Sequence, residues 1–177
     1  MRLALVLLTL LCAGQSLAAG LEQRLNIGLS LFPRIVAVDQ GLTEKLEHGR
    51  VRVALVSEGD RTLAFRLGKK LKRKTPTLAG HPLVVELAEP DELMRGPPPT
   101  AVFLAGPLSE ARFRRLADYL TRHRRLLFSA IPGDVERGAM AGISVTSRVL
   151  PYFNIPALEA AGIQLDPRVL AISKRHE

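Results

Sequence analysis

The stretch TAVFLAGPLSEARFRRLADYLTRHRRLLFSA, residues 100–130, decides the fold class. Its two ends, Thr100–Ala105 and Leu126–Ala130, are apolar on both faces, as strands are when they lie inside a parallel sheet. Between them Ser109 is placed to begin a helix as its N-cap residue. The helix is predicted from apolar side chains that recur at the spacing of one helix face, namely Phe113, Leu116, Ala117 and Leu120. The stretch therefore predicts a strand, a helix and a second strand.

The preceding part of the chain alternates in the same way. Helices are predicted at Leu21–Leu31, which Pro33 would stop, and at Thr62–Arg73, whose apolar residues share one face. Strand patterns occupy Arg34–Val38, Arg50–Val56 and His81–Leu87. This alternation predicts an α/β fold of three layers, with a mainly parallel, Rossmann-like sheet and helices on both of its faces.

The C-terminal part closes the fold differently. A strand pair is predicted within residues 139–153, followed by two short helices, Pro156–Ala161 and Pro167–Lys174. Our hypothesis is that the Asn154 side chain caps the first of these helices. Gly138 and Gly142 lead into a strand and not into a helix, unlike the glycines of a nucleotide-binding loop. They indicate tight turning or a close approach of backbones.

The N-terminal residues have the pattern of a secretory signal peptide. Arg2 precedes the apolar run Leu3–Leu11, and small residues allow cleavage after Ala18. That run is shorter than the ~20 residues needed to span a bilayer. Cys12 leaves lipid attachment open, although Leu11 stands where lipoprotein signals have a small residue. We expect a periplasmic protein whose single mature domain is residues 19–177 and contains neither cysteine nor disulfide.

Chemically reactive side chains do not form a recognisable catalytic set. Ser144 lacks the flanking glycines of a nucleophile elbow, and Asp134 and Glu136 are typical of a solvated loop. The histidines lack metal-ligand spacing: His48, His81, His123 and His176. We therefore expect no enzymatic activity, no cofactor and no metal. A hydrolase that uses Ser144 or Ser129 remains an alternative.

Positive charge is concentrated in the two predicted helices of the central region. The chain carries a net charge of +8, with few aromatic residues that could stack on nucleic-acid bases. These cations indicate either solvated helix faces or a surface for anionic lipid or an acidic partner. The candidates for such a surface are Lys69, Lys70, Lys72 and Arg73 in one helix and Arg112, Arg115 and Arg122 in the other.

Residues 138–171 resemble the closing segment of the YfiR-like family of small exported proteins. That segment has a glycine-rich turn, a strand, an arginine-containing second strand that ends in Asn, and two helices. The matching residues here are Gly138, Met140, Gly142, Arg148, Asn154 and Gly162. Upstream, residues 67–85 and 101–105 resemble the family in outline. Ala139 replaces the second glycine of the turn, and Pro151 interrupts the second strand.

The resemblance implies a periplasmic regulator. YfiR-like proteins bind and repress an inner-membrane diguanylate cyclase, and an outer-membrane lipoprotein relieves this repression. The released cyclase produces cyclic-di-GMP, which promotes biofilm formation. A small-ligand or anion-binding protein is the alternative, because open α/β sheets bind ligands at the carboxyl ends of their strands. Ser57, Ser109 and Asp134 would line that site. An open sheet edge would also allow a homodimer.

Overall fold

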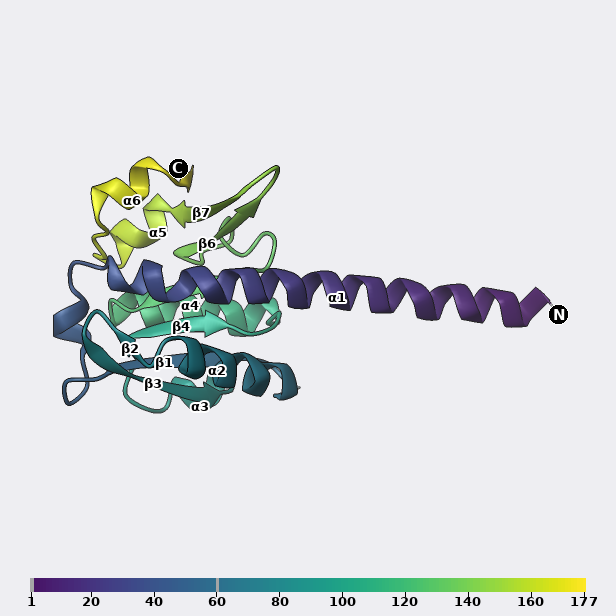
Figure 1. The fold of residues 1–177 in the computed structure, drawn as a ribbon, viewed down its shortest axis with the longest axis horizontal. Helices are drawn as coiled ribbons and strands as arrows, with labels where there is room; N and C mark the ends of the chain where they lie inside the picture. The colour runs from purple at the N-terminus through teal and green to yellow at the C-terminus, as the bar shows by residue number, and fades with distance from the viewer. Residues whose placement is uncertain (1, 60) are drawn as a thin grey trace.

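The computed structural model describes residues 2–59 and 61–177, with side chains from residue 19 onward. The signal peptide predicted for residues 1–18, with Cys12, lies outside the described side chains. Within the described residues eight strands form one sheet in the order β2-β3-β1-β4-β5-β6-β7-β8 (Figure 1). From β3 to β6 in that order, neighbouring strands run parallel. Strand β2 is antiparallel to β3, β7 is antiparallel to β6, and β8 is parallel to β7.

The strands are β1 (Val51–Val56), β2 (Thr77–Leu78), β3 (His81–Ala88), β4 (Ala101–Leu104), β5 (Leu126–Ser129), β6 (Ala141–Val145), β7 (Val149–Asn154) and β8 (Lys174–His176). The helices are α1 (Arg2–Ala37), the short 3-10 helix η1 (Leu42–Lys45), α2 (Thr62–Lys74), α3 (Pro90–Leu93), α4 (Glu110–Arg122), α5 (Ile155–Ala160) and α6 (Pro167–Ala171).

Helices cover both faces of the sheet, so the predicted three-layer α/β fold is confirmed. Side chains alternate along β4: Ala101 and Phe103 pack with α1 and α2, whereas Val102 and Leu104 pack with α3 and α4. The central strands are apolar at successive positions because each of them is buried from both sides.

Helix α1 corrects one strand prediction. Residues 34–37 belong to the helix, and Pro33 lies inside it instead of stopping it. Proline inside a helix costs about 3 kcal/mol or more. Burial of Phe32, Ile35 and Val36 in the core offsets this cost, since these side chains continue the buried stripe of the preceding turns. Tertiary packing therefore extends the helix through a segment whose local pattern resembled a strand.

An aromatic cluster joins α1 to the sheet. The Phe32 ring lies 5.4 Å from that of Phe103 and 5.6 Å from that of Phe128, measured between centroids. One helical turn earlier, Gly28 allows the helix to approach closely: a Cβ atom there would lie 2.6 Å from Ala130 Cβ. The part of α1 from residue 19 onward is thus a structural layer of the domain.

Most other predicted elements occur within three residues of their predicted bounds. The last predicted helix is wrong at its end, because α6 stops at Ala171 and Lys174 belongs to β8. Sequence patterns also missed η1, β2 and α3, which are four residues long or shorter. Among the described side chains, no helix has the length and apolar character that crossing a membrane requires.

Candidate functional site

The glycines of the C-terminal motif have structural roles. Gly138 adopts a φ of 124°, which side chains rarely allow, and ends the loop before β6. Gly142 lies in β6 against β5: a Cβ atom there would overlap the Ser129 carbonyl oxygen and lie 2.6 Å from Val135 Cγ2. Met140, between the two glycines, is fully buried. The prediction of turning and close backbone approach is confirmed.

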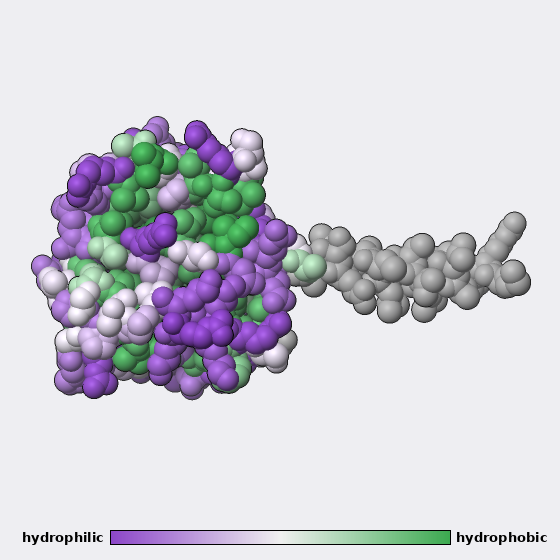
Figure 2. Space-filling view, in the orientation of Figure 1, coloured by the Kyte–Doolittle hydropathy of each residue, from purple (hydrophilic) through white to green (hydrophobic). Residues whose placement is uncertain are grey.

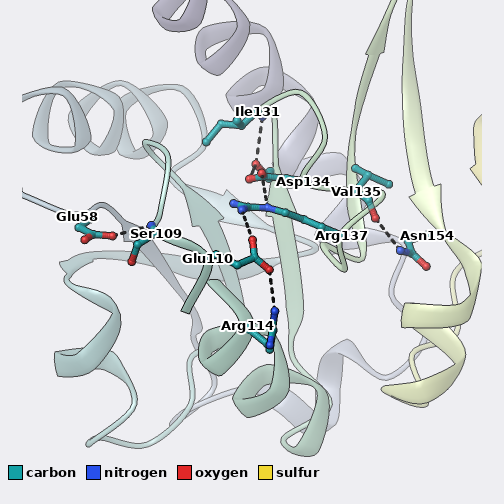
Figure 3. A network of polar contacts seen from close by, with 10 residues as sticks. Glu58, Ser109, Glu110, Arg114, Ile131, Asp134, Val135, Arg137 and Asn154 are labelled. Carbon is teal, nitrogen blue, oxygen red and sulfur yellow. Dashed lines mark hydrogen bonds and ion pairs between the residues drawn. The ribbon is translucent and has the colours of Figure 1, made fainter. Parts of the chain in front are cut away.

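Asn154 joins three elements. Its side-chain oxygen accepts a hydrogen bond from the Ala157 backbone N–H at 2.9 Å, which confirms the predicted cap of α5. Its amide nitrogen also donates to the Val135 carbonyl oxygen at 2.6 Å (Figure 3). This second bond fixes the loop before β6 to the end of β7. The sequence pattern did not reveal it, since residue 135 is distant along the chain.

The remaining motif residues lie elsewhere. Arg148 is exposed in the turn between β6 and β7. Gly162 follows α5 with a φ of 61°, and its carbonyl oxygen accepts a hydrogen bond from Arg124 at 3.1 Å. The motif therefore describes a C-terminal closure: Gly138, Gly142 and Asn154 meet around Val135, whereas Arg148 and Gly162 do not join them.

Asn154→Ala is expected to lower the free energy of unfolding by about 2 kcal/mol, because it removes a helix cap and the buried hydrogen bond that joins β7 to the Val135 carbonyl oxygen. Chemical denaturation of the mature domain would measure this loss. Asn154→Asp is the matched control, since it keeps the capping oxygen and removes the donor to Val135. Equal stability of Asn154→Ala and the wild type would contradict the structural role.

The carboxyl ends of the central strands carry their own polar network (Figure 3). Glu58, two residues after β1, accepts a hydrogen bond from the Ser109 backbone N–H at 2.9 Å and pairs with Arg112. These contacts hold the pKa of the Glu58 carboxyl below its ordinary value, the Ser109 bond contributing most. Ser109 is the N-cap residue of α4, as predicted, but its side chain makes no capping bond.

A second group of hydrogen bonds lies at the carboxyl end of β5. Ser129 Oγ donates to Asp134 at 2.6 Å, and Arg137 Nε donates to the other oxygen of the same carboxylate at 3.0 Å. Arg137 also binds Glu110 at 2.9 Å (Figure 3). Burial raises the pKa of Asp134, while Ser129 and Arg137 oppose that rise.

The predicted ligand-site residues at this edge are therefore engaged with the protein itself. Ser57, like Ser129 and Asp134, is at least 96% buried, and Ser109 is bound through its backbone to Glu58. Ser129 is also closed to a substrate, because its exposed fraction is 1%. Ser144 is half-buried in β6 and lies beside the shallow pocket that Tyr152 lines.

The cations of the two helices lie on opposite faces of the sheet, so they do not form one surface. Helix α4 packs with α3, whereas α2 packs on the face that carries α1. On α4, Arg112 pairs with Glu58 and Asp91, and Arg115 pairs with Asp91. The charges of these two arginines are thus largely balanced within the domain. Arg122 is exposed at the helix end.

The cations of α2 remain largely unbalanced. Arg66 pairs with Glu22, and Lys70 donates to Asn26 of α1. Four further cations are exposed and have no ion pair with any residue that the structure describes: Lys69, Lys72, Arg73 and Lys74. Figure 2 shows hydrophilic residues gathered over this part of the molecule.

An exposed aromatic ring lies among these cations. Phe65 is 53% exposed, and the Lys69 ammonium lies 5.1 Å from its ring centroid. A hollow of about 200 Å³ beside the ring has an apolar floor made of Gly68, Val85 and Leu87. We call the surface formed by Phe65, Lys69, Lys72 and Arg73 the α2 face. It combines an apolar hollow with a cationic rim.

Comparison with known proteins supports the fold and leaves the function open. No protein-family signature matches the chain, nor does any curated protein sequence. A conserved domain protein from Vibrio cholerae matches with a TM-score of 0.52 and 16% identity, over 77% of this chain and 58% of its own. An ABC domain from Streptococcus pneumoniae, solved in complex with L-Trp, matches with a TM-score of 0.50 and 10% identity, over 80% of this chain and 61% of its own.

The chain thus spans about three-fifths of the length of each of these two structures. At such low identity the likeness concerns the arrangement of strands and helices. The resemblance of residues 138–171 to YfiR-like proteins stays a prediction.

Proposed function

We propose that this protein is a non-enzymatic periplasmic regulator that binds and represses an inner-membrane signalling protein, a diguanylate cyclase. The α2 face is the contact surface, and its unbalanced cations around an exposed phenylalanine carry the proposal. Repression would lower cyclic-di-GMP and so restrain biofilm formation.

The charge pattern of the α2 face suits an acidic protein surface. Its three cations and the adjacent Lys74 are all exposed within six residues and repel one another, and an acidic partner would relieve that repulsion. Charge complementarity speeds association and selects partners, whereas apolar anchors provide much of the affinity. Phe65 and the hollow beside it offer such an anchor. An acidic segment that carries an apolar side chain fits both features.

The identity of the partner rests on the resemblance to YfiR-like proteins. In that family the repressed protein is a diguanylate cyclase, and an outer-membrane lipoprotein relieves the repression. An exported domain reaches the periplasmic part of such a cyclase, which agrees with the predicted signal peptide. Release would require the lipoprotein to compete for this chain.

Replacing Lys69 and Lys72 together by Glu is expected to weaken capture of the cyclase at least about tenfold, because two attractive charges become repulsive. Co-purification of the tagged mature protein from envelope extracts would measure the capture, and cellular cyclic-di-GMP should rise. The matched control exchanges two exposed arginines of α4 for Glu and should leave both readouts unchanged. They are Arg122 and Arg114, which pairs with Glu110 of its own helix. Undiminished capture by the α2 variant would refute the proposed contact.

A further inference from the structure

A polar pocket of about 480 Å³ lies at the amino ends of the central strands, opposite the polar network at their carboxyl ends. Three segments that are distant in the sequence line it: residues 39–45 after α1, residues 123–125 before β5, and residues 162–164 after α5. The amino ends of these strands face away from the N-terminal end of α1 in Figure 1. Its volume is within the range of small-molecule sites, ~300–1,000 Å³.

Backbone contacts hold the three segments together. The Gln40 N–H donates to the Gln164 carbonyl oxygen at 2.9 Å, beside a bridge between Asp39 and Leu165. Arg124 donates to the Gly162 carbonyl oxygen at 3.1 Å, which connects the second segment to the third. The pocket is therefore framed by fixed contacts between parts of the fold.

Arg125 is one of the cations that line this pocket. Its Nε and Nη1 atoms are buried without a hydrogen-bond partner, and the group has no ion pair with any described residue. The Asp39 carboxylate also lines the pocket but is already engaged by Lys45 and by the Gly41 N–H at 3.0 Å. Arg125 is half-buried at the wall of the pocket and has no ion-pair partner among the described residues, so its charge would stabilise an oxyanion that enters the pocket.

We propose that this pocket binds a small monocarboxylate that also carries hydroxyl groups. A carboxylate accepts charge-assisted hydrogen bonds from guanidinium N–H groups. The lining contains three cations, Lys45, Arg124 and Arg125, against two carboxylates, Asp39 and Glu44. This leaves one positive charge, which suits a monoanion better than a phosphate dianion.

The rest of the lining suits a hydroxylated ligand. Gln40 and Gln164 bring amide groups that both donate and accept hydrogen bonds, and His123 adds a ring nitrogen. Large apolar side chains do not occur among the described residues that line the pocket. The site is separate from the α2 face, so binding here does not depend on the proposed regulatory partner.

Titration calorimetry of the mature domain tests the site with three probes. D-galacturonate, a hydroxylated monocarboxylate, should give saturable heat, and so should D-gluconate. D-galactose differs from the first probe in lacking the carboxylate and should give none. Inorganic phosphate should bind more weakly than either acid. Absence of saturable binding by both acids, or tighter binding of phosphate, would overturn the proposal.

Variants tie the binding to Arg125. Arg125→Gln should weaken galacturonate binding about ten- to a hundredfold, the effect of losing a charge-assisted hydrogen bond. Arg125→Lys keeps the charge without the planar fork and should bind with intermediate strength, which provides a test if the glutamine variant does not fold. Arg122→Gln is the matched control, because Arg122 lies outside the pocket lining. Wild-type affinity in either Arg125 variant would reject the role of the Arg125 guanidinium.

Discussion

Phe32→Ala is expected to lower the free energy of unfolding by about 3–5 kcal/mol, the cost of removing a large aromatic side chain from a core. Phe32 is completely buried, and its ring contacts those of Phe103 and Phe128 in the two central strands β4 and β5. Truncation leaves a cavity that the rigid sheet cannot close, and it removes the contacts that hold α1 to the domain. Urea denaturation followed by circular dichroism would measure the loss.

Phe65→Ala is the matched control for this change. It removes the same side chain from a position that is 53% exposed, so stability should change by less than about 0.5 kcal/mol. Equal unfolding midpoints for Phe32→Ala and Phe65→Ala would mean that α1 does not pack on the sheet as described. The control also removes the apolar anchor of the α2 face, so its effect on partner capture can be measured without loss of fold.

Gly142→Ala is expected to destabilise the domain by about 3 kcal/mol, at the upper end of overpacking effects. The added Cβ would meet the Ser129 carbonyl oxygen, which belongs to the backbone of β5 and cannot rotate away as a side chain could. Either β6 separates from β5 or the loop that carries Val135 moves. Both outcomes disturb the Asn154 bond to that loop.

Gly106→Ala provides the comparison, because nothing lies within 4 Å of the corresponding Cβ position. The loop substitution should change the unfolding free energy by less than about 1 kcal/mol, and an increase is as acceptable as a decrease. Thermal and urea unfolding would measure the stability of both variants. A loss in Gly142→Ala alone would come from the close approach of the backbones, whereas a similar loss in both would be a general effect of replacing glycine. Wild-type stability of Gly142→Ala would contradict the tight contact between β5 and β6.

The sequence predicts the sheet well where its strands are buried on both faces. In β4 and β5 an unbroken apolar run is followed or preceded by a helical stripe, so local pattern and tertiary environment agree. Residues 34–38 were predicted to form a strand, since a short apolar run after a proline resembles one. Burial of Ile35 and Val36 in the core, which no local pattern reports, favours the helix there. Similarly, β8 has no apolar signal and forms because β7 offers a free edge.

The candidate sites were predicted less completely. Cations on α2 and α4 look alike in the sequence, yet Glu58 and Asp91 from distant segments neutralise Arg112 and Arg115 of α4. Glu58 and Arg112 are 54 positions apart, so their pairing cannot be read from helix spacing. The pocket beside Arg125 was missed for the same reason, because its lining comes from three separate segments. Its one local signal is the basic run before β5, which belongs to the cation-rich helix segment for which a solvated face and a partner or lipid surface were both left open.

The central claim is that this chain acts by contact through the α2 face. Site-specific photo-cross-linking in the cells that produce the protein tests it most directly, with the cross-linker placed at Lys69 of α2 or, as a control, at Arg122 of α4. The proposal predicts that position 69 captures an inner-membrane diguanylate cyclase and that position 122 does not. Capture of a cyclase from position 122 alone, or from neither position, would contradict it.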